Sequence, residues 1–176
     1  MSTSGSYHHG DLRAALLRTA GKMLEKEGLA SLSLRELARR AGVSHNAPYR
    51  HFPDRESLLA ALAGEGLERL GNALASRPRR QMGEAYVEFA LAHPQRFRLM
   101  FSGLVPLANR DRRAYESLQE AFVDLGEHAP YAAAAAWGLV HGLSHLLLDG
   151  HFEGRDKQRF VRDVLSTVRF SAPRTA

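Results

Sequence analysis

The sequence predicts an all-α fold of about nine helices, divided into a small N-terminal domain and a larger C-terminal domain. Apolar residues recur at three- and four-residue spacings along the 176-residue chain, and no stretch alternates with period two. A helix–turn–helix layout near the N-terminus indicates a small first domain. The length accommodates such a domain joined to a larger one. We expect the two domains at residues 1–53 and 54–176.

The first three predicted helices have clear ends, and the second and third are short. One is expected over residues 11–27, before a glycine suited to a left-handed conformation. A Ser-Leu-Arg-Glu capping box at residues 33–36 opens a two-turn helix that ends before Gly42. Ser44 is expected to cap a third helix that ends at Phe52, because the following proline disfavours a helical conformation at the residue before it.

Six further helices are expected. Asp54 is expected to cap a fourth helix that carries a row of leucines. The basic stretch Arg77–Arg80 is interpreted as a solvated linker between the fourth and fifth helices. The remaining helices are expected at residues 82–92, 94–102, 109–126, 130–149 and 156–170.

Composition excludes several classes of protein. The chain contains no Cys, which removes disulfide frameworks, thiolate zinc sites and cysteine nucleophiles. No apolar run typical of a signal peptide is readable near the N-terminus, and the most apolar run, residues 132–148, is short for a membrane span. We therefore expect a soluble cytoplasmic protein with no membrane partner. The net charge of +5 is compatible with a nucleic-acid partner without demonstrating one.

The third predicted helix carries an unusual number of polar and aromatic side chains. A glycine-containing turn precedes it, as a tight turn between crossed helices requires. Asn side chains can read adenine and Arg side chains can read guanine, whereas Tyr and His can contact phosphate. The side chains concerned are His45, Asn46, Tyr49, Arg50 and His51.

Residues 33–59, SLRELARRAGVSHNAPYRHFPDRESLL, resemble the DNA-binding domain of the TetR family of bacterial transcription regulators. The match rests on GVS followed by YRHF, and Pro48 departs from the Leu-type residue that most members carry there. WGLVHG at residues 137–142 and YHHGDL at residues 7–12 resemble the signatures of one C-terminal subclass.

The resemblance implies a homodimer that binds a palindromic DNA operator. Such proteins usually repress transcription until a small molecule enters the C-terminal domain, which also forms the dimer. By position, the resemblance makes His45, Asn46 and Ala47 base-contacting residues, with Arg50 as a further one. The residues that it implies for phosphate contact are Ser33, Ser44, Tyr49, His51 and Arg55.

Two later helices, at residues 130–149 and 156–170, are apolar on more than one face, which favours a four-helix bundle with a second copy. Gly138 and Gly142 lie one turn apart in the first of them and would permit close helix approach. Dimerisation through these helices is therefore expected from the pattern as well as from the resemblance.

Aromatic and methionine side chains predict an apolar or aromatic effector for the C-terminal domain, although ordinary core packing is the alternative interpretation. The sequence shows no charged cluster that indicates an anionic ligand, and it predicts neither a cofactor nor a metal. The residues expected to line the effector cavity are Met82, Tyr86, Phe89, Phe97, Met100, Phe101, Phe122, Trp137 and His141.

Two other functions are compatible with parts of the sequence. His141, His145 and Asp149 follow one another at four-residue spacing, so a metal-dependent hydrolase is an alternative. The Glu of the metalloprotease HExxH motif is absent, because residues 141–145 read HGLSH, and no nucleophile–base pair accompanies them. A helical scaffold that binds another protein is the second alternative. The regulator remains the main prediction, and it requires no enzymatic activity.

Overall fold

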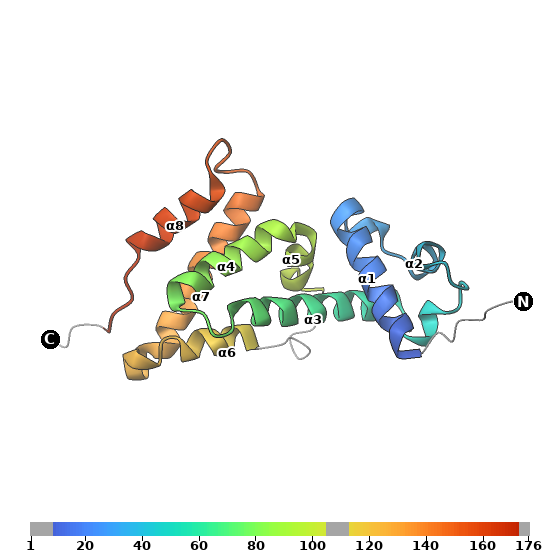
Figure 1. Ribbon diagram of the computed structural model, residues 1–176, viewed down its shortest axis with the longest axis horizontal. Coiled ribbons are helices and arrows are strands. Elements are labelled where there is room, and N and C mark those ends of the chain that lie inside the picture. The colour runs from blue at the N-terminus through green and yellow to red at the C-terminus, as the bar shows by residue number, and fades with distance from the viewer. Residues whose placement is uncertain (1–8, 105–112, 173–176) are drawn as a thin grey trace, which may run out of the picture. The chain divides into compact units, whose positions relative to one another are not determined.

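The computed structural model describes residues 9–104 and 113–172, and within these ranges the chain is helical with no strand (Figure 1). The predicted all-α fold is therefore confirmed. Eight α-helices and several 3-10 segments are present in the described residues. The α-helices are α1 (His9–Glu27), α2 (Leu34–Ala41), α3 (Arg55–Leu74), α4 (Arg79–Ala92), α5 (Pro94–Phe101), α6 (Arg113–Glu120), α7 (Ala129–Leu148) and α8 (Lys157–Thr167).

The chain divides into two compact units. The described residues of the first unit are 9–65 and 98–104, and those of the second are 66–97 and 113–172. Helix α3 contributes its N-terminal half to the first unit and its C-terminal half to the second. The domain boundary expected between residues 53 and 54 therefore falls inside the first unit.

In the first unit, α1 packs against α2, and both bury leucines. Ser33 caps α2, because its hydroxyl oxygen accepts the backbone N–H of Glu36 at 3.1 Å. Leu32 and Leu37 flank this cap and are both buried, which matches a hydrophobic staple. The start of the two-turn helix is thus fixed by its own sequence.

The third helix of the first unit differs from the prediction. The N–H of Ala47 donates to the carbonyl of Ser44 at 2.9 Å, and a single 3-10 turn, Pro48–Arg50, follows without a side-chain cap. An α-helix capped by Ser44 would need a hydrogen bond from residue 48 to the Ser44 carbonyl, and proline has no N–H to donate. The expected α-helix from Ser44 to Phe52 is therefore wrong, whereas the eight α-helices of the described residues agree with the prediction of about nine helices.

In the second unit, α4 packs against both α7 and α8, and α6 packs against α7 (Figure 1). The helix expected over residues 109–126 is wrong in its second half, because α6 ends at Glu120 and a 3-10 segment, Val123–His128, follows. Gly126 adopts φ 56° and ψ −126° within that segment, so the chain turns there before α7 begins. Residues 109–112 lie outside the described part of the chain.

Two smaller expectations concern the basic linker at residues 77–80 and the apolar run at residues 132–148, which was expected to be short for a membrane span. Arg79 and Arg80 form the first turn of α4 instead of a linker. The stretch Val123–Leu148 is long and apolar enough to cross a membrane by length and composition alone, with a mean hydropathy of 1.2. A core helix of a soluble protein has the same properties, and α7 packs against α4 and α6 within its unit.

Candidate nucleic-acid interface and effector pocket

The segment after α2 is held in place by two buried residues. Gly42 ends α2 in the left-handed conformation, with φ 67° and ψ 32°, which turns the chain sharply. Pro48 and Phe52 then point into the core of the first unit, and the Arg13 guanidinium lies 5.4 Å from the centre of the Phe52 ring. These anchors fix the backbone of the residues between them.

The residues around these anchors face solvent. His45, Asn46 and Arg50 are exposed, and 48% of Tyr49 is accessible. Ala47 and His51 are half-buried. The structure thus brings the predicted base-contacting residues together on one exposed segment, although that segment is a turn and a single 3-10 helix.

The three other predicted DNA contacts occupy different settings. Ser33 and Ser44 are exposed, and the Ser33 hydroxyl already caps α2. The Arg55 guanidinium donates through Nε to the Leu32 carbonyl and through Nη2 to the Leu29 carbonyl, both at 2.8 Å. Arg55 therefore holds the start of α3 to the connection between α1 and α2, a role that the sequence pattern did not reveal.

A charge network joins α1 to α2 beside this segment. Arg40 bonds to the Glu27 carboxylate at 2.5 and 2.7 Å and to Glu36 at 2.7 Å, and Arg39 also bonds to Glu36. Hydrogen bonds from Arg39 and Arg40 lower the pKa of Glu36 to about 2. Arg40 therefore links α2 to α1 through Glu27, whereas the pair of Arg39 and Glu36 lies within α2.

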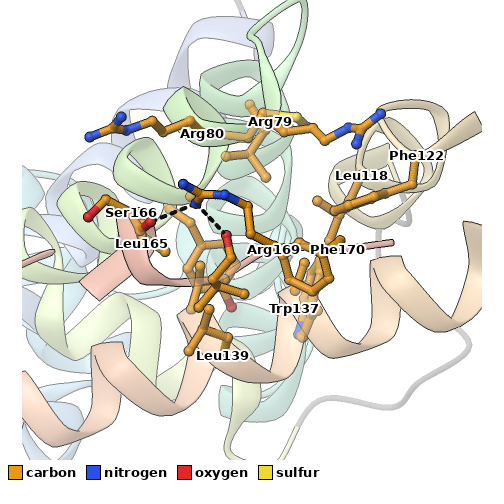
Figure 2. Close-up of a pocket in the computed structure, with 17 residues that line it drawn as sticks. Arg79, Arg80, Leu118, Phe122, Trp137, Leu139, Leu165, Ser166, Arg169 and Phe170 are labelled. Carbon is orange, nitrogen blue, oxygen red and sulfur yellow. Dashed lines mark hydrogen bonds between the residues drawn. The ribbon is translucent and has the colours of Figure 1, made fainter. Parts of the chain in front are cut away.

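A pocket of about 330 Å³ opens in the second unit among α4, α6, α7 and the end of α8 (Figure 2). Its size lies within the range of small-molecule sites. Most of its wall is apolar or aromatic. The lining residues are Leu74, Arg79, Arg80, Met82, Gly83, Tyr86, Leu118, Phe122, Ala136, Trp137, Leu139, Val140, Leu165, Ser166, Val168, Arg169 and Phe170.

Four of the nine residues predicted to line the cavity do so: Met82, Tyr86, Phe122 and Trp137. The tight packing of these rings is seen at Tyr86 and Trp137, whose ring centres lie 5.4 Å apart. The other five predicted residues are absent from the pocket wall, namely Phe89, Phe97, Met100, Phe101 and His141.

Each of these five residues has another place. Phe97 is buried with its ring 5.8 Å from Tyr86, and the buried Phe89 ring lies 5.1 Å from that of His93. Met100 and Phe101 belong to the first unit, where Met100 is buried. These side chains belong mainly to the core, which was the alternative interpretation of the aromatic pattern.

His141 lies behind the wall of the pocket, where its Nδ1 is 2.9 Å from the Tyr86 hydroxyl. Burial raises the pKa of Tyr86, and burial together with His145 lowers the pKa of His141. The Tyr86 hydroxyl and Nδ1 of His141 share one hydrogen bond, whose donor is set by the tautomer of the imidazole ring. This pair satisfies two polar groups beneath an apolar wall.

The hydrolase alternative receives no support from the geometry. The rings of His141 and His145 lie 4.7 Å apart, and Tyr86 occupies Nδ1 of the first. In residues 9–104 and 113–172, no group of three His, Asp or Glu side chains is placed to hold a metal ion. Asp149 therefore does not complete a three-ligand site.

Sequence reasoning missed the three arginines of the pocket. Arg79 and Arg80 were assigned to a linker, and Arg169 lies beyond the end of α8. Arg169 lies about 90 positions after Arg79 and Arg80 in the chain, so no local pattern brings it together with them. Pro78 immediately before the two basic residues is a helix-start signal that would have placed Arg79 and Arg80 in the first turn of α4.

The first unit carries a helix-turn-helix with an exposed polar segment, and the second unit holds a largely apolar pocket. Together these features define the class of two-domain helix-turn-helix proteins. The family described as "Bacterial regulatory proteins, tetR family" matches residues 16–62, and "Tetracyclin repressor-like, C-terminal domain" matches residues 80–168. The chain belongs to the TetR family.

Individual relatives agree with this assignment. The chain is 36% identical over 72 residues to the HTH-type transcriptional regulator EthR of Mycolicibacterium smegmatis, covering 39% of this chain and 33% of EthR. It is 45% identical over 51 residues to the class C tetracycline repressor of Escherichia coli, covering 29% of this chain and 23% of the repressor. The aligned parts thus span a third or less of these curated relatives.

A solved structure matches almost the whole chain. A protein of unknown function from Rhodococcus sp. RHA1 is 36% identical, with a TM-score of 0.74, and the alignment covers 93% of this chain and 96% of that one. The likeness therefore extends across both units of the fold.

Proposed function

We propose that this protein is a sequence-specific DNA-binding transcriptional regulator that releases a palindromic operator when a small molecule enters the second unit. One observation carries the proposal: an exposed polar segment, His45–Arg50, is anchored by buried neighbours in the helix-turn-helix of a TetR-family chain. The proposal makes the protein a cytoplasmic, non-enzymatic repressor, with residues 1–53 binding DNA and 54–176 binding effector and partner.

The proposed DNA contacts are of two kinds. His45, Asn46 and Arg50 have the exposure and the hydrogen-bonding groups to contact base edges, with Ala47 beside them. Tyr49 and His51 would contact phosphates, together with the exposed hydroxyls of Ser33 and Ser44.

Arg55 has a different role in the proposal from the one that the resemblance implied. Its hydrogen bonds to the Leu29 and Leu32 carbonyls occupy Nε and Nη2. We therefore assign to it the positioning of α3 on the helix-turn-helix, with phosphate contact limited to its remaining nitrogen.

Helix α3 offers a route for coupling between effector and DNA. Its first residue, Arg55, is tied to the first unit, and its last residue, Leu74, lines the pocket. A ligand that displaces Leu74 would bias the position of a continuous helix whose other end is bonded to the connection between α1 and α2. The two copies of that segment must lie about 34–36 Å apart to enter successive major grooves.

A dimer through α7 and α8 is also part of the proposal. One face of α7 carries exposed apolar side chains: Tyr131 is 75% exposed and Leu146 is 41% exposed. Gly138 and Gly142 lie between them and are exposed, and a methyl group added at either Cα would meet no described atom within 4 Å. A second copy could approach this stripe closely.

Selection of bound sequences from random duplex DNA, with the full protein, tests the function. The proposal predicts an inverted repeat whose half-sites are separated by about one helical turn. Recovery of no enriched sequence would contradict it and would favour the protein-binding scaffold.

Substitution at Gly142 tests the dimer. Gly142→Ala should weaken dimerisation, since its methyl group would stand in the helix contact. Gly64→Ala is the matched control, because its surroundings in α3 are equally open. Both changes favour the helix by up to about 1 kcal/mol. Sedimentation equilibrium should show a raised dimer dissociation constant for the first variant alone; equal behaviour would contradict this dimer.

A further inference from the structure

The pocket of the second unit combines an apolar wall with a basic rim. Three arginines line it, Arg79, Arg80 and Arg169, and the lining contains no Asp or Glu. Figure 2 shows Arg79 and Arg80 along one edge, where their side chains extend in opposite directions, and the Arg169 side chain between that edge and the wall that holds Trp137 and Leu139. The charge that faces a bound molecule is therefore positive.

The three guanidinium groups differ in how far protein groups already balance them. Arg79 bonds to the Asp124 carboxylate and to the Ala121 carbonyl, and its guanidinium lies 4.7 Å from the centre of the Phe122 ring. It therefore acts mainly as part of the wall, because its charge has a carboxylate partner.

Arg80 and Arg169 are less compensated. Arg80 has its Nε 3.5 Å from Glu84, and 60% of its side chain remains exposed. Arg169 donates through Nη1 to the carbonyls of Ser166 and Val168, at 2.6 and 3.1 Å. No carboxylate from the described ranges pairs with Arg169. Its Nη2 and Nε remain available to a ligand.

The Arg169 guanidinium is also held in position. The two carbonyls belong to the last turn of α8 and to the residue that ends it, so the helix terminus orients the group. The next residue, Phe170, packs its ring 5.1 Å from that of Phe122 on the pocket wall. The short tail after α8 is thereby fastened across the pocket, and it carries the charged group with it.

We infer that the pocket binds a small organic carboxylate with an apolar alkyl or aryl body. The body would lie against Trp137, Tyr86 and Phe122, and the carboxylate would meet Arg169, with Arg80 adjacent. Arginine suits this task because its planar fork can bond both carboxylate oxygens. The inference rests on the proposed function for its regulatory meaning, and it adds a carboxylate to the apolar or aromatic effector expected from the sequence.

Matched acid and amide probes test the charge requirement directly. The probes are 4-phenylbutyrate with 4-phenylbutyramide, and decanoate with decanamide, titrated into the full protein. Trp137 is the chain's single Trp and lines the pocket, so its fluorescence reports occupancy, and calorimetry supplies the dissociation constant. The inference predicts that at least one acid binds roughly tenfold or more tighter than its amide.

Variants assign the effect to Arg169. Arg169→Gln should weaken acid binding roughly tenfold and leave amide binding unchanged, whereas Arg169→Lys should retain most of the preference for the acid. Arg159→Gln removes the same charge from an exposed position on α8 outside the pocket and should change neither. A loss of both acid and amide binding in Arg169→Gln would indicate a structural role and overturn the assignment.

Two results would overturn the inference itself: equal affinity for acid and amide, or no binding of any of the four probes at millimolar concentration. These results leave operator selection untouched, so a protein that selects a palindrome but ignores the charge keeps its proposed function. Conversely, if the protein prefers the acids but selects no DNA sequence, the carboxylate-binding pocket is supported and the proposed regulatory function is contradicted.

Discussion

The helix-turn-helix and the effector pocket are built from the chain in different ways. In the first, a cap at Ser33, a turn at Gly42 and an anchor at Phe52 follow one another within 20 residues. In the second, the wall joins Arg79, Trp137 and Arg169 from three distant parts of the chain. The comparison teaches that local signals define the DNA-contacting region, whereas long-range packing defines the pocket.

The two regions also use arginine differently. Around the helix-turn-helix, Arg39 and Arg40 are held by acidic side chains, and Arg40 links α2 to α1 through Glu27. At the pocket, Arg169 is held by backbone carbonyls and keeps its charge unmatched. The first arrangement stabilises structure, and the second leaves a cation available to a ligand.

The largest expected effect is a loss of stability in the first unit that leaves the second unit folded. Leu37 is fully buried in α2, so Leu37→Ala should lower the unfolding free energy of the first unit by about 2–5 kcal/mol and abolish DNA binding. Trp137 fluorescence should report a second unit that stays folded to higher denaturant concentration. Arg35→Ala, on the exposed side of the same helix, is the control and should cost less than about 0.5 kcal/mol. A single unfolding transition for both units of Leu37→Ala would contradict this difference in stability.

The next effect separates the two proposed kinds of DNA contact. Arg50→Ala should cost about 1–3 kcal/mol of binding on the preferred sequence and relax the base preference at one position. Tyr49→Phe should weaken binding to every sequence alike, because it removes a hydroxyl that meets phosphate. Fluorescence anisotropy measures the binding of both proteins to the selected operator and to operators with single-base changes. Identical profiles for Arg50→Ala and Tyr49→Phe would show that the division into base and phosphate contacts is wrong.

A smaller effect concerns the polar pair behind the pocket. Tyr86→Phe removes the hydroxyl that bonds to His141 and should cost about 1 kcal/mol, since a part-buried ring nitrogen loses its partner. Denaturant unfolding followed by Trp137 fluorescence measures it. Tyr49→Phe, at a position 48% exposed in the first unit, is the control and should leave the stability of the DNA-free protein unchanged. If Tyr86→Phe were neutral, the hydrogen bond would have no net stabilising role.

The smallest effect is the pH dependence of the network between α1 and α2. The pKa of Glu36 is lowered to about 2, so its ion pairs stabilise the folded protein fully above its unfolded value of 4.5. That contribution is lost as the pH falls from about 4.5 through about 2. Glu36→Gln should therefore lower Tm slightly at pH 7 and make little difference near pH 2.

Thermal melts at several pH values measure this difference. Glu88→Gln, at an exposed position of α4, is the control and should leave Tm unchanged at each pH. A Tm difference for Glu36→Gln that stays constant from pH 7 to pH 2 would contradict the ion-pair account.

Much of the first unit could be predicted from sequence because its determinants are local. The Ser33 cap, the two-turn helix and the left-handed Gly42 all depend on neighbours along the chain. The exception, the 3-10 turn at Pro48, arises from the same kind of local rule, and stricter use of the missing proline N–H would have predicted it.

The pocket was only partly predictable because apolar periodicity does not distinguish core from cavity. Phe97 and Trp137 have the same helical pattern in the sequence, yet only Trp137 reaches the pocket. The break after Glu120 and the position of Arg169 depend on packing between distant segments, which no local pattern encodes.

The most direct test of the central claim is a hydroxyl-radical footprint of the full protein on the selected operator. The account predicts two protected stretches, related by the symmetry of the sequence, with centres about 34–36 Å apart along the duplex. One protected stretch, or uniform cleavage at saturating protein, would contradict a paired insertion of the segment His45–Arg50 into successive major grooves.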